Sequence, residues 1–196
     1  PCTAERLMAA VGPLDALVLD ASLQIRRPWP EISLEEYQKQ MTCNFYSSLR
    51  LIQLAVPHMK AQKWGRIVTI GSVQERKPHP DMLVYSASKA AQTNMVQSLA
   101  QQLAADGITV NNVAPGVILT DRNVEALDDP AYAAQVTASI PAGFYGEPQD
   151  CAGEDLANDH HDNAHGKADE DGAMDGFGEI LLVPCAKIAG AEHVDT

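Results

Sequence analysis

The sequence is poor in aromatic residues, in cysteine and in positive charge. Aromatic side chains make up 5% of its 196 residues. The four cysteines are scattered without a C-x-x-C pair, which argues against a disulfide framework or a thiolate zinc site. Fourteen lysines and arginines stand against 26 acidic residues, giving a net charge of −12. Nucleic acid and anionic membrane surfaces are therefore poor partners, and we expect a small molecule or another protein.

Long hydrophobic runs are also missing. No apolar stretch approaches the roughly 20 residues that a membrane-spanning helix needs, and the first residues lack the basic-then-apolar order of a secretory signal. We therefore expect a cytoplasmic protein. Hydrophobic residues nevertheless amount to 45%, which is enough for a globular core.

The acidic excess is concentrated at one end of the chain. Residues 1–150 hold 15 acidic and 12 basic residues, whereas residues 151–196 hold 11 acidic residues and two lysines. We place the change near Gly153. The composition predicts a folded core over residues 1–153 and an acidic, atypical segment over 154–196.

Within the core, helical and strand-like patterns alternate. Residues 3–11, 34–59 and 84–104 have helical spacing, and Ser33 with Glu36 forms a capping box before the second of these. Residues 14–19, 67–70 and 108–113 are short apolar runs typical of buried strands. This alternation predicts an α/β fold with a doubly wound parallel sheet.

In such sheets ligands bind beyond the carboxyl ends of the strands. The residues that come after the three predicted strands are Asp20-Ala21-Ser22, Ser72-Val73-Gln74 and Pro115-Gly116. Tyr85 and Lys89 are four residues apart and therefore share one helix face. A short loop would return this face to the strand that ends at Ser72, so we expect a hydroxyl, a phenol and an ammonium group to meet there.

Over residues 3–153 the chain resembles the short-chain dehydrogenase/reductase family. Ser72, Tyr85 and Lys89 match the catalytic triad of the family, and Asn44 matches its fourth catalytic residue. Residues 115–120 match the P-G-x-x-x-T segment at the nicotinamide end of the cofactor, and Gly146-Glu147-Pro148 matches a later G-x-P turn. The resemblance implies a Rossmann-like fold and an NAD- or NADP-dependent exchange between a ketone and a secondary alcohol.

The resemblance also implies a role for each residue. Tyr85 would be the general acid/base, Lys89 its electrostatic partner and a ribose ligand, and Ser72 the hydroxyl that orients the carbonyl. Asn44 would hold a water in a proton relay, unless it is a helix-interior amide bonded to nearby backbone. No metal site is expected, and the implied cofactor-binding residues are Asp20, Ala21, Ser22, Tyr85, Lys89, Pro115, Gly116, Val117, Ile118 and Thr120.

The implied partners are small molecules and further copies of the chain. The family acts on 3-oxoacyl, sugar, polyol and steroid-type substrates. Its members commonly form dimers or tetramers through helices equivalent to 34–59 and 84–104, so we expect a homo-oligomer.

Two features depart from the family pattern. The chain begins near the helix before the fourth strand of the family, so the first two βα units are absent from the N-terminus, and Leu19-Asp20-Ala21-Ser22 replaces N-N-A-G. In the acidic segment, residues 172–178 fit the pattern G-x-x-x-G-x-G. A circularly permuted cofactor loop over 172–190 is therefore an alternative interpretation of the C-terminus.

Two other functions stay open from the residues alone. The chain could be an inactive remnant that serves only as an assembly or interaction protein, which predicts no nicotinamide-dependent turnover. It could instead be an acidic-tailed protein that binds divalent cations through clustered residues, namely Asp159, His160, His161, Asp162 and His165.

Overall fold

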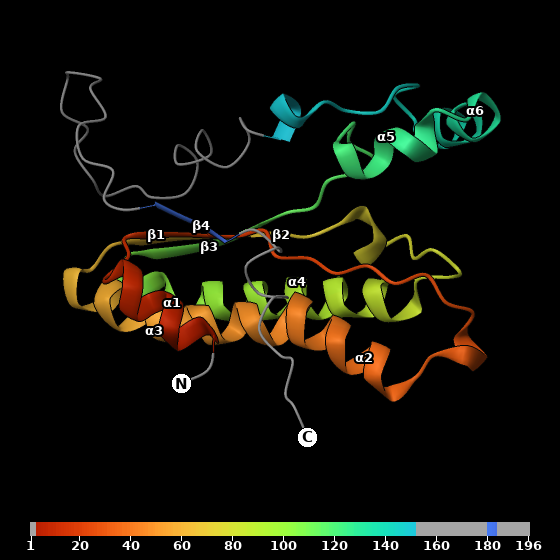
Figure 1. Ribbon diagram of the computed structural model, residues 1–196. Coiled ribbons are helices and arrows are strands. Elements are labelled where there is room, and N and C mark those ends of the chain that lie inside the picture. The colour runs from red at the N-terminus through yellow and green to blue at the C-terminus, as the bar shows by residue number, and fades with distance from the viewer. Residues whose placement is uncertain (1–2, 152–179, 184–196) are drawn as a thin grey trace, which may run out of the picture.

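A four-stranded parallel sheet forms the centre of the protein. The computed structural model describes residues 3–151 and 180–183 (Figure 1). The strands are β1 (Ala16–Leu19), β2 (Gly65–Ile70), β3 (Ile108–Val113) and β4 (Ile180–Val183), in the order β3-β2-β1-β4. All pairs are parallel, with Leu17 opposite Ile67 and Ile67 opposite Val110. The parallel α/β sheet expected from the sequence is confirmed.

The helices that come before β3 in the chain lie together on one face of this sheet (Figure 1). They are α1 (Thr3–Val11), α2 (Leu34–Met41), α3 (Ser47–Gln62) and α4 (Leu83–Leu103). The crossovers from β1 to β2 and from β2 to β3 move in the same direction along the sheet, and right-handed crossovers then place their helices on the same face. Two further helices, α5 (Asp121–Leu127) and α6 (Pro130–Ser139), lie on the opposite side of the sheet (Figure 1).

The helix expected over residues 34–59 is interrupted by a wider turn. It begins at the capping box, where the Glu36 N–H donates to Ser33 Oγ and the Ser33 N–H donates to Glu36 Oε2, both at 3.1 Å. Between α2 and α3, residues Thr42–Tyr46 form a π-helical turn, η2. Such turns occur frequently at functional sites, and Asn44 lies inside this one.

The hydrophobic core lies between the sheet and the helices that cover it. Leu17, Ile67 and Val110 enter it from β1, β2 and β3. From the helices come Leu51, Ile52, Ala55, Met59, Met95, Val96 and Leu103. The side chains of β1 to β3 that point to this face thus keep the strand ends rigid, which is what a site built on those ends requires.

The end of α3 and the end of α4 meet at one junction. A short 3-10 turn, η4 (Ala104–Asp106), comes after α4 and stops at Gly107, whose φ is 72°. A side chain at Gly107 would overlap the carbonyl oxygen of Lys63, so glycine is required there. Beside it, Asp106 forms ion pairs with Lys60 at 3.0 Å and with Lys63 at 2.6 Å.

The two segments predicted from composition share the sheet. Residues 180–183, which belong to the predicted acidic segment, form β4 and pair with β1. The boundary near Gly153 and the remainder of that segment lie outside the described residues, so the division at 153 stays a prediction. Within residues 3–151 and 180–183, no helix combines the length and the apolar content that crossing a membrane requires.

Candidate active site

Ser72 lies at the carboxyl end of β2, at the start of a 3-10 turn, η3 (Val73–Glu75). Its backbone is still extended, and its Oγ accepts a hydrogen bond from the Gln74 N–H at 3.2 Å. A serine hydroxyl can cap such a turn because its oxygen satisfies an N–H group that lacks a backbone partner. The cap fixes the Ser72 oxygen at the strand end.

Lys89 and Tyr85 lie in the first two turns of α4 and are almost fully buried, with 1% and 6% of their surfaces exposed. Lys89 Nζ donates a hydrogen bond to the carbonyl oxygen of Ile70 at 2.6 Å and lies 5.9 Å from the centre of the Tyr85 ring. Ile70 is the last residue of β2, two positions before Ser72. The ammonium group therefore connects the strand end that carries Ser72 to the helix face that carries Tyr85.

Gln74 strengthens the same connection from the loop. Its Oε1 accepts a hydrogen bond from Ser86 Oγ at 3.0 Å, and its Nε2 contacts Met82 Sδ at 3.8 Å. These partners lie on either side of Tyr85 in the chain. The sequence placed Gln74 at the strand end but gave it no role, because its partners are known only from the fold.

Asn44 is fully buried in η2, and its amide binds three protein groups. Its Oδ1 accepts from the Leu23 N–H at 2.7 Å, while its Nδ2 donates to the Leu23 carbonyl and to Ser88 Oγ, both at 2.9 Å. Asn44 thus ties the loop after β1 to α4. These contacts match the alternative in which the amide bonds to backbone, except that the backbone is 21 residues away. A water held by Asn44 stays a prediction.

The expected cofactor-binding segments also lie at the carboxyl ends of their strands. Asp20 is exposed at the end of β1, Ala21 is buried, and Ser22 lies beside them with a buried Oγ. After β3, the Pro115 carbonyl accepts from the Val73 N–H at 2.9 Å, which places this segment against the turn that begins at Ser72.

The segment from Pro115 to Thr120 is held at its far end by Gly146. The Leu119 N–H donates to the Gly146 carbonyl at 2.8 Å, and the Gly146 N–H donates to the Val117 carbonyl at 2.9 Å. Thr120 then begins α5 as its N-cap residue. Ile118 pairs with Gly146 in an isolated parallel bridge. The sequence had associated these two segments with the same family pattern, and the fold brings them into contact.

Glu75 is a buried carboxylate beside the site that the sequence analysis missed. With a side chain 6% exposed, its Oε2 accepts from Thr93 Oγ1 at 2.5 Å and from Asn112 Nδ2 at 3.1 Å. Asn112 Oδ1 in turn accepts from Thr69 Oγ1 at 2.7 Å. This network attaches the turn after Ser72 to α4 and β3. The glutamate is 18 to 37 residues from its partners, so no local pattern indicated it.

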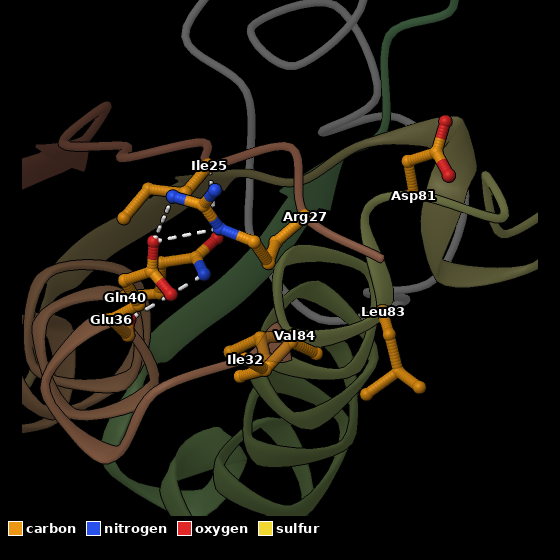
Figure 2. Close-up of a pocket in the computed structure, with 8 residues that line it drawn as sticks. All are labelled: Ile25, Arg27, Ile32, Glu36, Gln40, Asp81, Leu83 and Val84. Carbon is orange, nitrogen blue, oxygen red and sulfur yellow. Dashed lines mark hydrogen bonds and ion pairs between the residues drawn. The ribbon is translucent and has the colours of Figure 1, made fainter. Parts of the chain in front are cut away.

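A shallow surface groove lies beside this site, between α2, the first turn of α4 and the loop before α2 (Figure 2). Figure 2 shows Arg27 above Glu36, with their ion pair at 2.5 Å. The hydrogen bond from Arg27, with a further one from the Ser33 N–H, holds the pKa of Glu36 below its usual value. None of the predicted site residues lines the groove, so we do not assign it to the active site.

Some predicted features cannot be placed. The glycine pattern at 172–178 and the Asp/His cluster at 159–165 lie outside the described residues. Both stay predictions.

Comparisons with known proteins show which family the chain matches. The family model for short chain dehydrogenases matches residues 2–131. The chain is 30% identical over 149 residues to the 5-keto-D-gluconate 5-reductase of Escherichia coli K12, and 37% identical over 144 residues to the glucose 1-dehydrogenase of Gluconobacter oxydans. These matches cover 76% and 73% of this chain but only 59% and 54% of the two relatives. The chain thus spans little more than half the length of these relatives.

A solved structure gives the same result. A 3-oxoacyl (acyl-carrier-protein) reductase from Agrobacterium tumefaciens, crystallised with NADP bound, matches with a TM-score of 0.71 and 36% sequence identity. The match covers 76% of this chain and 58% of that one. The parallel sheet and its helices therefore share the fold of that reductase.

Proposed function

The chain belongs to the short chain dehydrogenase family, and from this premise we propose that it is an NAD(P)-dependent oxidoreductase that interconverts a ketone and a secondary alcohol. The observation that carries the proposal is the position of Lys89. Its buried ammonium binds the end of β2 beside Ser72 and lies next to the ring of Tyr85. A positive charge buried in this position would favour the ionised form of the neighbouring Tyr85 phenol.

In the proposed reaction the bound nicotinamide supplies or accepts the hydride. Tyr85 donates its phenolic proton to the carbonyl oxygen during reduction, and Ser72 donates a hydrogen bond to the same oxygen. The ammonium group of Lys89 stabilises the phenolate that remains, because an adjacent positive charge favours the ionised form of an acid. In the direction of oxidation the Tyr85 phenolate accepts the proton of the alcohol hydroxyl, while Ser72 keeps its hydrogen bond to the same oxygen.

The described residues fit the nicotinamide end of the cofactor. Lys89 provides a buried donor, and the backbone of residues 115–120 runs beside η3. A side chain built on Gly116 would meet nothing within 4 Å, so a bound molecule can approach this backbone. A glycine-rich turn for the pyrophosphate does not come after β1, β2 or β3, the strands of the continuous described stretch. We therefore propose that other residues of the protein hold the phosphates.

The names of the relatives suggest which substrates to test first. Two of them are a 5-keto-D-gluconate 5-reductase and a glucose 1-dehydrogenase, and a structural neighbour is a 3-oxoacyl reductase. We propose a small carbonyl or alcohol substrate, with sugar-type ketones and 3-oxoacyl thioesters as the first two classes to assay. Cofactor choice is resolved by titrating the full chain with NADH and NADPH while monitoring tryptophan and nicotinamide fluorescence. If neither binds, the inactive-remnant alternative replaces the proposal.

Replacing the phenol tests the acid/base assignment. Tyr85→Phe should lower kcat about 10²- to 10⁴-fold, because proton transfer by a positioned side chain contributes that much, while NADPH affinity stays close to wild type. Stopped-flow turnover and fluorescence titration measure the two effects. Tyr46→Phe is the matched control, since Tyr46 is 55% exposed on η2 and should be replaceable without loss. Equal rates for Tyr85→Phe and wild type would contradict the assignment.

We further propose that the protein assembles as a homo-oligomer, a dimer or a tetramer, through the helices that lie between β1 and β3 in the chain. Leu34 and Tyr37 on α2, Tyr46 on η2 and Leu83 on α4 are apolar or aromatic and between 46% and 70% exposed. A second copy covering them would remove this surface from water.

A further inference from the structure

A buried polar contact joins α3 to α4 directly behind Lys89. Gln92 lies one turn after Lys89, Ser48 lies in the first turn of α3, and their exposed fractions are 0% and 1%. Gln92 Oε1 accepts a hydrogen bond from Lys89 Nζ at 3.3 Å, and Gln92 Nε2 donates to Ser48 Oγ at 3.4 Å. Because an ammonium group can only donate, the oxygen of the amide must face Lys89. Ser48 thus orients the amide.

The choice of glutamine at this position is not explained by packing. Gln92 precedes the core residues Met95 and Val96 along α4, and a buried amide costs free energy unless it is hydrogen-bonded. A leucine of similar volume would fill the same space without that requirement. The buried ammonium of Lys89, by contrast, needs acceptors. Glutamine provides one without itself neutralising the positive charge, as a glutamate would.

We infer that Gln92 is a positioning residue for Lys89: it holds the ammonium group against the Ile70 carbonyl and leaves its positive charge to act on Tyr85. The consequence for catalysis rests on the proposed function. The hydrogen bond between Lys89 and Gln92 lies within the chain. It can therefore be measured without cofactor or turnover.

The direct test observes the Lys89 side chain by NMR in the full chain labelled with ¹³C-lysine. The ε-methylene resonance is assigned by its loss in Lys89→Arg and is recorded against pH. All forms carry Tyr85→Phe, so that this titratable neighbour of Lys89 does not ionise in the same range. Gln92→Leu should lower the midpoint of the titration by about one pH unit, because the ammonium loses an acceptor. Gln92→Glu should raise it by a similar amount, because a carboxylate favours the ammonium.

Gln40 offers a matched control. It is also a buried glutamine, with 2% of its surface exposed, and its Oε1 accepts from the Ile25 N–H at 3.1 Å. Gln40→Leu removes the same kind of buried amide from α2 and should leave the midpoint of Lys89 unchanged. Leucine is accommodated in a protein core, so both variants should fold. A midpoint that is the same in Gln92→Leu, Gln40→Leu and the parent overturns the inference.

A kinetic test addresses the catalytic consequence, and its variants keep the natural Tyr85. Gln92→Leu and Gln92→Glu should each lower kcat about 10-fold, within the range expected for perturbing an acid/base group, while KM for the ketone changes less than twofold. Unchanged kcat in both variants would overturn the positioning role. If the midpoint shifts as expected and no form turns over, the Gln92–Lys89 contact is supported and the proposed oxidoreductase function is contradicted.

Discussion

Glu75 has no proposed chemical step, yet it determines how firmly Ser72 is held. Its carboxylate is 6% exposed and accepts hydrogen bonds from Thr93 on α4 and from Asn112 on β3. The Glu75 N–H donates to the Ser72 carbonyl at 3.0 Å, so the turn and its side-chain network form one unit. Removing the carboxylate takes an acceptor from two partly buried donors, although Asn112 Nδ2 keeps its second contact, with Thr93 Oγ1 at 3.1 Å.

Glu75→Ala should therefore lower the free energy of unfolding by about 1–2 kcal/mol, because partly buried donors that lose a charged acceptor keep part of their desolvation penalty. Urea denaturation monitored by circular dichroism measures the change. Glu35→Ala is the matched control: Glu35 is 74% exposed in an ion pair with Lys39, and its loss should cost less than about 0.5 kcal/mol. Equal losses in the two variants would show that the Glu75 network is not stabilising.

At this scale the sequence indicated the candidate catalytic groups but not the residues that hold them. Tyr85 and Lys89 are four residues apart, so their relation comes from helix geometry alone. Gln92 and Ser48 are 44 residues apart, and Asn44 and Leu23 are 21 apart. The first of these contacts depends on how α3 packs against α4, and the second depends on how the loop after β1 packs against η2. Hydrophobic spacing along one helix does not specify either arrangement.

Among the elements, η2 is one that the helical spacing of the sequence does not predict. The apolar spacing over residues 34–59 fits one continuous helix, and the π-helical turn adds a residue without breaking that helix. One extra residue rotates the side chains of α3 by about 100° relative to a regular α-helix. The turn places Asn44 where it meets both Leu23 and Ser88. Those partners, rather than the local sequence, account for its position.

The junction between α3 and η4 gives the protein a pH-dependent contact. Hydrogen bonds from Lys63 and then from Lys60 hold the pKa of Asp106 below its usual value. The carboxylate is therefore favoured in the folded state, and its contribution to stability is present above the unfolded pKa of about 3.9 and lost as the pH falls through the folded value.

Asp106→Asn should consequently lower Tm by a small amount at pH 7 and by progressively less as the pH falls below about 4. Because the ion pairs are partly exposed, 1 M salt should also reduce the difference between the two proteins. Differential scanning calorimetry across this pH range, at low and high salt, measures both effects. A difference that is constant with pH would assign the loss to packing around Asp106 instead of its charge.

The whole molecule presents apolar side chains on the helices that cover one face of its sheet. If these helices form the proposed assembly surface, wild type should be a dimer or tetramer by sedimentation velocity at micromolar concentration. Tyr46→Glu should weaken association at least 10-fold, because it places a charge in the contact. Val124→Glu on α5, across the sheet from those helices, is an exposed control that should assemble normally (Figure 1). A monomeric wild type would contradict the proposal.

Several properties were determined by the sequence itself. Alternating helical and strand-like patterns determined the α/β class, and the positions of Ser72, Tyr85 and Lys89 relative to those patterns determined the chemistry to look for. The α/β class is confirmed, and it could be inferred because it depends on short-range periodicity and on the rule that parallel strands bring their carboxyl ends to one edge; the catalytic roles stay a proposal. The capping box at Ser33 is equally local, and the structure confirms it.

Only the tertiary structure decided the pairing of β4 with β1 and the buried polar contacts around Lys89. Residues 180–183 were simply an apolar run in the sequence, since a strand of four residues gives no indication of its neighbour. The supporting residues Gln74, Glu75 and Gln92 are polar side chains whose partners come from other elements. Their effect arises when folding removes them from water, where each hydrogen bond must be satisfied within the protein.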